Sequence, residues 1–480
     1  MSRDPVAIAS ALEAPTRTPL EVLDIGVPLE RDEHLSDLGN ARRLVAEYGE
    51  RILYCRPLRT WYVWDGVRWA KDQRGKILDL AKRTVLALWA DVEDAPDLRT
   101  RERIAKHALQ SESEPRIRAL VALAESDPAI SVLPVDLDAD PWLLNVGNGT
   151  LNLKTGELLP HQPEDRITKL APVTYDPKAC LPLWDEFLDR ALPDAELRTF
   201  VRRAVGYSLT GSTQEEVLFF VHGPAASGKS TFVESMKAAL GDYAVTADFA
   251  TFLASKGAGG ASPRSDLVRL AGARFVSSAE VDKGRRMAEG LVKLLTGGDT
   301  VTARALYRGE TEFVPAFKLW LVANDRPRVP DDDEPLWRRI LEVPFVVPIP
   351  AEERDASVKA TLRDPEIAGP AILAWAVEGY QFWQQSGLDP PEAVRFATAS
   401  YREEMDPLRE FVAERCRFDG EATVKADALW KAYQEFSKDA GERFPLERRS
   451  FTERLKKLGL EHNTGGRITR WAGIGLLDHA

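Results

Sequence analysis

The stretch "HGPAASGKST" occupies residues 222–231 and directly follows the apolar run "VLFFV" at 217–221. Near-continuous apolar runs of this length are typical of strands in a parallel sheet that is buried on both faces. The residues after the loop, "TFVESMKAALG", have apolar side chains at helical spacing and end on a glycine that can stop a helix. The sequence therefore predicts a strand, a glycine-rich loop and a helix in succession, within an α/β domain.

The loop fits the pattern GxxxxGK[ST] at every fixed position. Glycines let backbone N–H groups close around phosphate oxygens, the lysine reaches the β- and γ-phosphates, and the hydroxyl ligates Mg²⁺. The residues expected to bind ATP are Gly223, Pro224, Ala225, Ala226, Ser227, Gly228, Lys229, Ser230 and Thr231. We expect Lys229 to act in catalysis and Ser230 to hold Mg²⁺. Kinases, GTPases, transporters and motors share such a loop, so it does not decide the function alone.

Polar residues follow two further apolar runs, "ARFVSSAE" and "AFKLWLVAN". Glu280 ends the first run and Asp282 comes two residues later; a carboxylate there can hold Mg²⁺ and orient the attacking water. An ordinary acid at a strand end is an equally good interpretation. Asn324 ends the second run, where an amide can bond the γ-phosphate or the water, although an Asn-Asp pair also forms turns.

Two arginines, and a predicted β-hairpin that bears Arg304, Tyr307 and Arg308, complete the pattern. Arg338 and Arg339 follow an acidic loop, and an arginine that reaches a neighbouring subunit's ATP raises the rate of hydrolysis by roughly 10³–10⁵-fold. A solvated pair of charges is the alternative. Residues 264–328 contain twelve Lys or Arg and eight Asp or Glu, a net charge of +4 (12 − 8) in a chain of net charge −11. This local reversal favours contact with nucleic-acid phosphates.

The composition limits the class of protein. A chain of 480 residues is expected to form two to four domains, and 44% hydrophobic with 29% charged residues is ordinary for a soluble globular protein. The three cysteines are far apart, which favours reduced thiols over a metal site or a disulfide framework. With no signal pattern and no apolar run of membrane-spanning length, we expect a cytoplasmic protein without a membrane partner.

The flanking segments have their own patterns. Residues 1–20 predict a flexible tail, and "LSDLGNARRLVAEYGERI" after it predicts a helix. A hairpin is expected to turn at Asp65-Gly66, and further turns at Asn148-Gly149 and Thr155-Gly156. The tryptophans of the hairpin at Asp65-Gly66 suit stacking on nucleic-acid bases, but packing between the two strands of the hairpin explains them more simply. Residues 183–211 predict helix up to Gly211.

In order along the chain, the phosphate loop, Glu280, "LTGGDTVTARALYRG", "KLWLVAND" and "WRR" resemble the superfamily 3 helicases. The resemblance is closest to the phage and plasmid primase-helicases, which include the poxvirus primase-helicase. It is dense over residues 200–350 and weaker over "WYVWDGVRW", "NVGNGTLNL" and "RITRWAGIGL".

The resemblance implies an AAA+-type ATPase core that works with ATP and Mg²⁺ in a homo-hexamer around single-stranded or forked DNA. By position, Asn324 matches the sensor asparagine, and Arg338 or Arg339 matches the arginine finger. The family's pore hairpin falls on Arg304, Tyr307 and Arg308, which implies that they bind DNA. Many relatives have two adjacent acids where this chain has Ala279 and Glu280, so the part played by Asp282 stays open.

The expected domains follow from this resemblance. They are a flexible tail (1–20), an α+β N-terminal domain (21–165), a helical collar (166–212), the ATPase core (213–350), a helical segment that completes it (351–405) and a winged helix (406–480). Arg448, Arg449, Lys456 and Lys457 flank the second helix of the last domain, which suits either duplex DNA or a protein partner. "VLPVDLDADP" is the nearest match to a primase metal strand and lacks the histidine strand beyond it, so we expect no primer synthesis and a separate primase or loader.

We therefore predict an ATP-dependent DNA helicase that replicates a phage or mobile element, in the host cytoplasm if the element is a phage. The alternative is an ATP-gated replication initiator or assembly switch that binds DNA without processive unwinding. A small-molecule P-loop kinase is a third hypothesis, disfavoured by the arginine pair, the hairpin and the additional domains.

Overall fold

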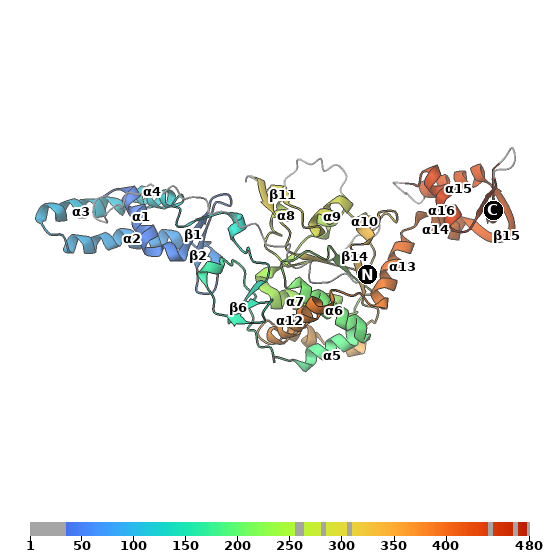
Figure 1. Ribbon diagram of the computed structural model, residues 1–480, viewed down its shortest axis with the longest axis horizontal. Helices are drawn as coiled ribbons and strands as arrows, with labels where there is room; N and C mark the ends of the chain where they lie inside the picture. Colours follow the sequence, from blue (N-terminus) through green and yellow to red (C-terminus); the bar gives the residue numbers. More distant parts are fainter. Residues whose placement is uncertain are drawn as a thin grey trace, which may run out of the picture. The chain divides into compact units, whose positions relative to one another are not determined.

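The computed structural model describes residues 35–254, 264–279, 285–304, 310–439, 445–463 and 469–477 of a mixed α/β protein (Figure 1). Residues 1–20, for which a flexible tail is predicted, lie outside these ranges. The chain divides into two compact units, Met1–Gly49 with Gly75–Ile130, and Glu50–Arg74 with Ser131–Ala480. Among the described residues, no helix has both the length and the apolar character needed to cross a membrane.

The first unit is helical. Its helices are α1 (Asp37–Tyr48), α2 (Lys76–Glu93), α3 (Leu98–Ser111) and α4 (Glu114–Ala124). The predicted helix is confirmed as α1, which begins where the Ser36 hydroxyl accepts a hydrogen bond from the Gly39 N–H at 3.1 Å. A buried polar cluster ties α1 to α3, because the Asn40 amide donates to the Ser111 hydroxyl at 3.0 Å and lies 3.1 Å from His107 Nε2.

The second unit begins with two small sheets. One has the order β3-β2-β1-β4, with β1 (Ile52–Cys55), β2 (Thr60–Trp64), β3 (Trp69–Lys71) and β4 (Ser131–Val132). The other is the antiparallel sheet of β5 (Leu143–Val146), β6 (Gly149–Asn152) and β7 (Leu158–Leu159). The predicted turns are confirmed between these strands. The rings of Trp64 and Trp69 lie 5.7 Å apart across the aromatic hairpin, and Trp61 lies 4.9 Å from Tyr54, so the expected packing is confirmed.

The central sheet has the order β14-β8-β13-β10-β9, and all its neighbouring strands are parallel. Its strands are β8 (Leu218–His222), β9 (Ala244–Thr246), β10 (Phe275–Ala279), β13 (Lys318–Ala323) and β14 (Ile340–Pro344). The apolar runs predicted as strands are confirmed, whereas the short β9 was not predicted. His222 is in register with Ala323 on one side and Pro344 on the other, so the loops after these strands leave the same edge of the sheet.

Helices cover both faces of this sheet (Figure 1). One layer contains α5 (Pro182–Ala191), α6 (Ala195–Ser208), α7 (Lys229–Leu240), α11 (Ala356–Leu362) and α12 (Gly369–Ser386). The other contains α8 (Ser265–Val268), α9 (Glu289–Thr296), α10 (Glu334–Trp337) and α13 (Glu392–Glu404). The helical stretch predicted over 183–211 is interrupted between α5 and α6 at residues 192–194, where Pro193 has no N–H to continue a helix.

A hairpin and a C-terminal domain complete the unit. The hairpin predicted after α9 is confirmed as β11 (Val301–Arg304) and β12 (Glu310–Phe313). The C-terminal elements are α14 (Pro407–Arg415), β15 (Cys416–Lys425), α15 (Ala426–Asp439), α16 (Arg448–Lys457), β16 (Glu461–Asn463) and β17 (Arg470–Leu476). The two helices and the two strands expected over this segment are confirmed as elements, and β15 adds an unpredicted strand to a sheet of order β15-β17-β16. The short 3₁₀ helices are η2 (Gly49–Arg51), η3 (Pro134–Asp136), η4 (Pro163–Asp165), η5 (Gly241–Tyr243), η6 (Phe249–Phe252) and η7 (Ala351–Glu353).

Candidate nucleotide site

The glycine-rich loop lies between β8 and α7, at the carboxyl edge of the central sheet. Gly223 has a φ of +152°, and a Cβ there would lie 2.0 Å from the Phe345 carbonyl oxygen, so the position has no room for another residue. The Phe345 N–H donates to the His222 carbonyl at 2.7 Å, and the Ile349 N–H donates to the Ala226 carbonyl at 2.9 Å. The chain that follows β14 therefore holds the loop at both its start and its apex.

Lys229 opens α7 and folds back into this loop. Its side chain is buried, with 6% of the residue exposed, and its Nζ donates to the carbonyls of Gly223 and Pro224 at 2.6 Å each. Burial lowers the pKa of Lys229. The ammonium group is thus held by neutral carbonyl oxygens. Negatively charged oxygens would be stronger partners for it. Ser230 is exposed beside it, and free N–H groups at the first turn of a helix favour an anion.

The other predicted groups approach the same edge from neighbouring strands. Asn324 is exposed and follows Ala323, the residue of β13 in register with His222. Ala279 is in register with Val322, so β10 ends beside β13. Glu280 and Asp282, predicted as metal ligands, lie outside the described residues, and their roles stay predictions. Within the described ranges, no group of three or more His, Cys, Asp or Glu residues is arranged to hold a metal ion.

The two candidate arginines lie at the opposite edge of the sheet. Both precede β14, and the Leu218 N–H at the start of β8 donates to the Arg339 carbonyl at 2.7 Å. A five-residue strand separates this edge from the phosphate loop by about 13 Å. Arg339 is engaged within the subunit, since it pairs with Glu216 at 2.7 Å and donates to the Pro335 carbonyl at 3.0 Å. Arg338 is exposed.

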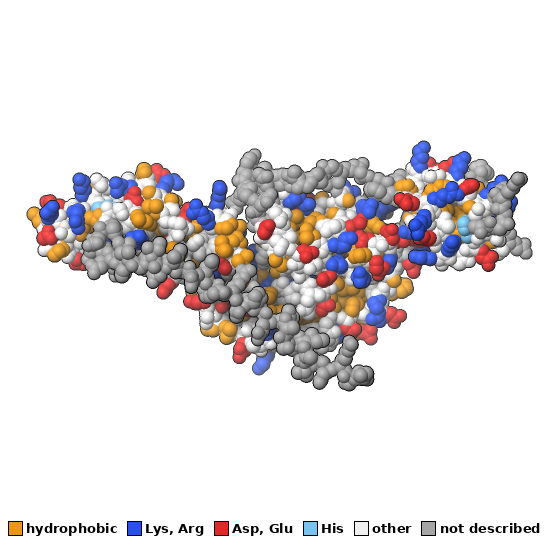
Figure 2. Space-filling view, turned by 45° about the horizontal axis from the view of Figure 1, so that its top comes forward, with side chains coloured by type: hydrophobic (Ala, Val, Ile, Leu, Met, Phe, Trp, Pro, Cys, Tyr) orange, Lys and Arg blue, Asp and Glu red, His pale blue; other side chains and the backbone are white. Residues whose placement is uncertain are grey.

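The predicted DNA-binding residues belong to the β11–β12 hairpin. Arg304 is the last residue of β11, while its side chain, Tyr307 and Arg308 fall outside what the structure describes. Two of the twelve basic residues counted over 264–328, Arg274 and Lys318, are buried and cannot contact nucleic acid. Removing these two leaves ten cations against eight acids (12 − 2 = 10). On the face shown in Figure 2, basic and acidic side chains are interspersed.

A buried ion pair beside the phosphate loop was not predicted. Glu342 of β14 has 1% of its side chain exposed and accepts hydrogen bonds from Nη2 and Nε of Arg326, at 2.6 and 3.0 Å. The same carboxylate lies 3.1 Å from His222 Nδ1. A single acid inside the apolar run "ILEVPF" was the signal for it, because a charge in a buried strand requires a partner.

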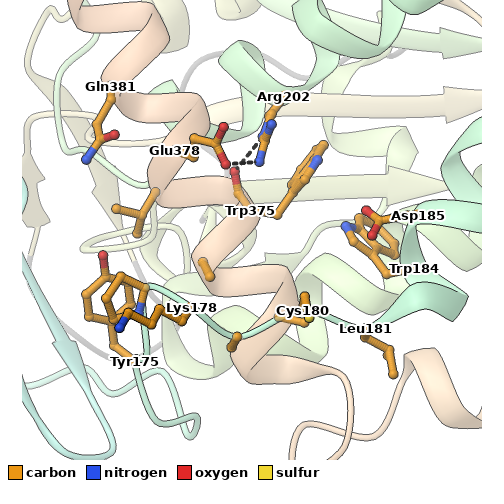
Figure 3. A pocket seen from close by; sticks show the side chains of 15 residues that line it. Tyr175, Lys178, Cys180, Leu181, Trp184, Asp185, Arg202, Trp375, Glu378 and Gln381 are labelled. Carbon is orange, nitrogen blue, oxygen red and sulfur yellow. Dashed lines mark hydrogen bonds and ion pairs between the residues drawn. The ribbon is translucent and has the colours of Figure 1, made fainter.

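A separate hollow of about 460 Å³ lies among α5, α6 and α12 (Figure 3). The Arg202–Glu378 ion pair lies at its wall, beside the ring of Trp375. None of the residues predicted to bind nucleotide or DNA lines it. Its charged side chains include both cations and carboxylates, so the lining favours no particular ligand.

Comparison with known families gives two matches, one in the N-terminal part of the chain and one in the C-terminal part. Residues 41–193 match the family described as D5 N terminal like, and residues 403–470 match the one described as Poxvirus D5 protein-like. Two separate regions of the chain therefore match D5-type family models. The resemblance to the poxvirus primase-helicase group is thereby confirmed. The phosphate loop lies between the two matched regions.

Three viral proteins illustrate the similarity. The chain is 27% identical to "Putative helicase L207/L206" of Acanthamoeba polyphaga mimivirus over 301 residues, 58% of this chain and 31% of that protein. It is 30% identical to "Putative helicase 022R" of Frog virus 3 over 269 residues, 52% of this chain and 27% of the other. It is 23% identical to "Putative primase C962R" of African swine fever virus over 299 residues, 58% and 31% of the two chains.

This chain matches less than a third of the length of each of these relatives. Among solved structures it is similar to the apo C-terminal region of NrS-1, with a TM-score of 0.47 and 11% identity over 89% of this chain and 88% of that one.

Proposed function

We propose that this chain is an ATP-dependent DNA helicase or translocase that acts in the replication of a phage or mobile element. The observation that carries the proposal is the buried Lys229 inside a glycine-rich loop, at the sheet edge where β13 delivers Asn324. The names of the viral relatives support a place in DNA replication. In this proposal the central sheet and its helices are an AAA+-type ATPase core, with a winged helix at the C-terminus, working in the host cytoplasm.

The residues at the sheet edge divide the work on ATP. Backbone N–H groups of the loop and of the first turn of α7 bind the phosphates, and Lys229 exchanges its carbonyl partners for the β- and γ-phosphate oxygens. Ser230, with Glu280 and Asp282, would hold Mg²⁺, which neutralises charge on the phosphates. Asn324 and Glu280 orient the attacking water. An arginine from another subunit of a homo-hexamer stabilises the transition state, because Arg338 and Arg339 lie too far from their own loop.

DNA contacts are assigned to two parts of the chain. The β11–β12 hairpin, with Arg304, Tyr307 and Arg308, follows the phosphates of the single strand as ATP is hydrolysed. The winged helix has a weaker basic surface than its sequence indicates, because Arg448 pairs with Asp427, and Arg449 lies 3.1 Å from Glu453. Lys456 and Lys457 remain exposed on α16. In this proposal a separate primase makes the primers, or a separate loader places the ring on DNA.

The test is ATP hydrolysis by the full chain with and without single-stranded DNA, over a series of salt concentrations, beside Lys229→Ala. We expect DNA to stimulate hydrolysis, the stimulation to fade as salt rises, and the variant to lose activity. Hydrolysis that is indifferent to DNA contradicts the motor and favours the ATP-gated initiator. A chain that remains a monomer on sizing chromatography and phosphorylates a small molecule would favour the kinase.

A further inference from the structure

The carboxylate of Glu342 joins the strand that carries the phosphate loop to the segment that carries Asn324. On one side it lies 3.1 Å from Nδ1 of His222, the residue directly before Gly223. On the other it receives a two-pronged hydrogen bond from Arg326, two residues after Asn324. Two loops expected to touch ATP are therefore tied to one buried charge.

Arg326 extends this connection to α13. Its Nη1 lies 2.5 Å from Glu404 Oε1 at the end of that helix, and its guanidinium lies 5.3 Å from the centre of the Tyr401 ring. The Tyr401 hydroxyl donates to the Pro327 carbonyl at 2.5 Å, next to Arg326 in the chain. Thr398, one turn earlier on α13, accepts a hydrogen bond from the Glu342 N–H at 3.0 Å. Three side chains of one face of α13 thus contact the segments that flank the nucleotide site.

The helix α13 leads directly into the C-terminal domain. Asp406 follows its end and caps α14, accepting a hydrogen bond from the Leu408 N–H at 3.0 Å. Arg454 of α16 binds the same carboxylate at 2.8 Å and also pairs with Asp331, in the loop after β13. A displacement of α13 would therefore move Asp406 and, with it, the start of the C-terminal domain.

We propose that Arg326 and Glu342 are positioning residues that transmit the state of the nucleotide site to α13. The inference rests on the proposed ATPase function. Contact of Asn324 with a γ-phosphate moves the chain segment that carries Arg326, and the rigid, planar guanidinium passes that movement to Glu404 and Tyr401. Because the Arg326–Glu342 pair is buried, water cannot replace a partner that either side chain loses. We therefore expect the two side chains to change their arrangement together.

The first test is hydrogen–deuterium exchange of the full chain with and without Mg²⁺ and a slowly hydrolysed ATP analogue. In the wild-type chain we expect the analogue to slow exchange several-fold in peptides of the phosphate loop and of α13. Protection of the loop without any change in α13 would overturn the coupling while leaving the nucleotide site in place. No protection of either peptide would instead contradict the proposed ATPase function.

Glu404→Gln is the variant of choice, because Glu404 is half exposed and its replacement leaves the buried Arg326–Glu342 pair intact. Glu403→Gln is the matched control, with the same change of charge on the adjacent residue of α13, which pairs with Arg409 instead. We expect Glu404→Gln to abolish the response of α13 and to keep that of the phosphate loop, whereas Glu403→Gln keeps both. Equal responses of α13 in the two variants would overturn the proposal.

Kinetics test the positioning role. Arg326→Gln is expected to lower kcat for ATP at least tenfold while changing KM less than threefold, and Arg326→Lys, which keeps the charge but not the fork, is expected to recover part of that loss. An equal loss in both variants together with a lower unfolding temperature would show that the pair only stabilises the fold, and would overturn the positioning role.

Discussion

Arg274 and Lys318 are two cations placed side by side inside the protein. Arg274 precedes β10 and donates to the Leu209 carbonyl at 2.6 Å, while Lys318 opens β13 and donates to the Thr210 carbonyl at 2.6 Å. Both carbonyls follow the end of α6, where the helix dipole carries its negative charge. The two side chains therefore fasten the amino edge of the central sheet to the C-terminus of a helix, which explains why this buried layer tolerates charge.

Lys318 gives a prediction about pH. Burial, followed by the charge of Arg274, holds the pKa of Lys318 well below its ordinary value of 10.5. The unfolded chain therefore binds this proton more readily than the folded chain, so the contribution of Lys318 to stability rises with pH up to that ordinary value. As the pH rises, we expect the free energy of unfolding of the wild type to increase relative to that of Lys318→Met, by up to about 1.4 kcal/mol per pH unit.

Urea unfolding of both chains at pH 7, 8 and 9 measures this difference. Lys431→Met, at a solvent-exposed position on α15, is the control and should show no such trend. Parallel pH profiles for the wild type and Lys318→Met would mean that Lys318 keeps an ordinary pKa inside the protein.

These residues also show which parts of the site the sequence reveals. The contacts of Lys229 are all local, with the loop that precedes it, and a short motif with fixed spacing predicts them. Lys318 binds residues more than a hundred positions away, and in the sequence it counted as one more surface charge. The pairing of Glu342 with Arg326 was not predicted for the same reason, since it depends on how β13 and β14 flank β8.

At the scale of elements, α6 and α12 cross with their backbones in close contact. A Cβ on Gly206 would lie 2.0 Å from the Tyr380 backbone nitrogen, and a Cβ on Gly379 would lie 2.0 Å from the Arg202 carbonyl oxygen. Such distances require the two backbones to touch, and only glycine permits it. This contact holds the helical layer on the face of the sheet that also carries α7.

We expect Gly206→Ala to separate the two helices and to lower the free energy of unfolding by about 1–3 kcal/mol. Gly290→Ala in α9 is the matched control, because no atom lies within 4 Å of the added Cβ. That substitution should raise stability by about 0.5–1 kcal/mol through helix propensity. Urea unfolding followed by circular dichroism compares the two, and equal effects would contradict the close crossing.

Elements with strong apolar runs were predictable, and those defined by their surroundings were not. The strands β8, β10 and β13 of the central sheet were predicted from their apolar runs, since their side chains are almost all buried. The three-residue β9 has no such run, and it becomes a strand only by pairing with β10. The helices α2 to α4 were not predicted, although α2 has buried apolar residues at helical spacing, Ile77, Ala81, Val85 and Leu88.

At the scale of the whole molecule, the phosphate loop and the arginine pair lie at opposite edges of one sheet. A single chain therefore cannot complete the proposed catalytic site, whereas a ring that repeats one head-to-tail interface brings the two edges together. Arg338 is the better candidate for the finger, because Arg339 is held by Glu216 within its own subunit. We expect Arg338→Ala to leave stability unchanged and to reduce ATP hydrolysis by roughly 10³-fold or more.

Mixing subunits tests this assignment. Lys229→Ala and Arg338→Ala chains should each be inactive alone, yet an equal mixture should form about one interface in four with an intact lysine on one side and an intact arginine on the other. We therefore expect the mixture to recover a substantial fraction of wild-type hydrolysis, measured as phosphate release after the chains are combined and allowed to exchange. If Arg339→Ala complements Lys229→Ala and Arg338→Ala does not, the finger is Arg339. If neither mixture gains activity although the chains assemble, the arginines do not act across the interface, and the proposed ring must complete its sites with other residues.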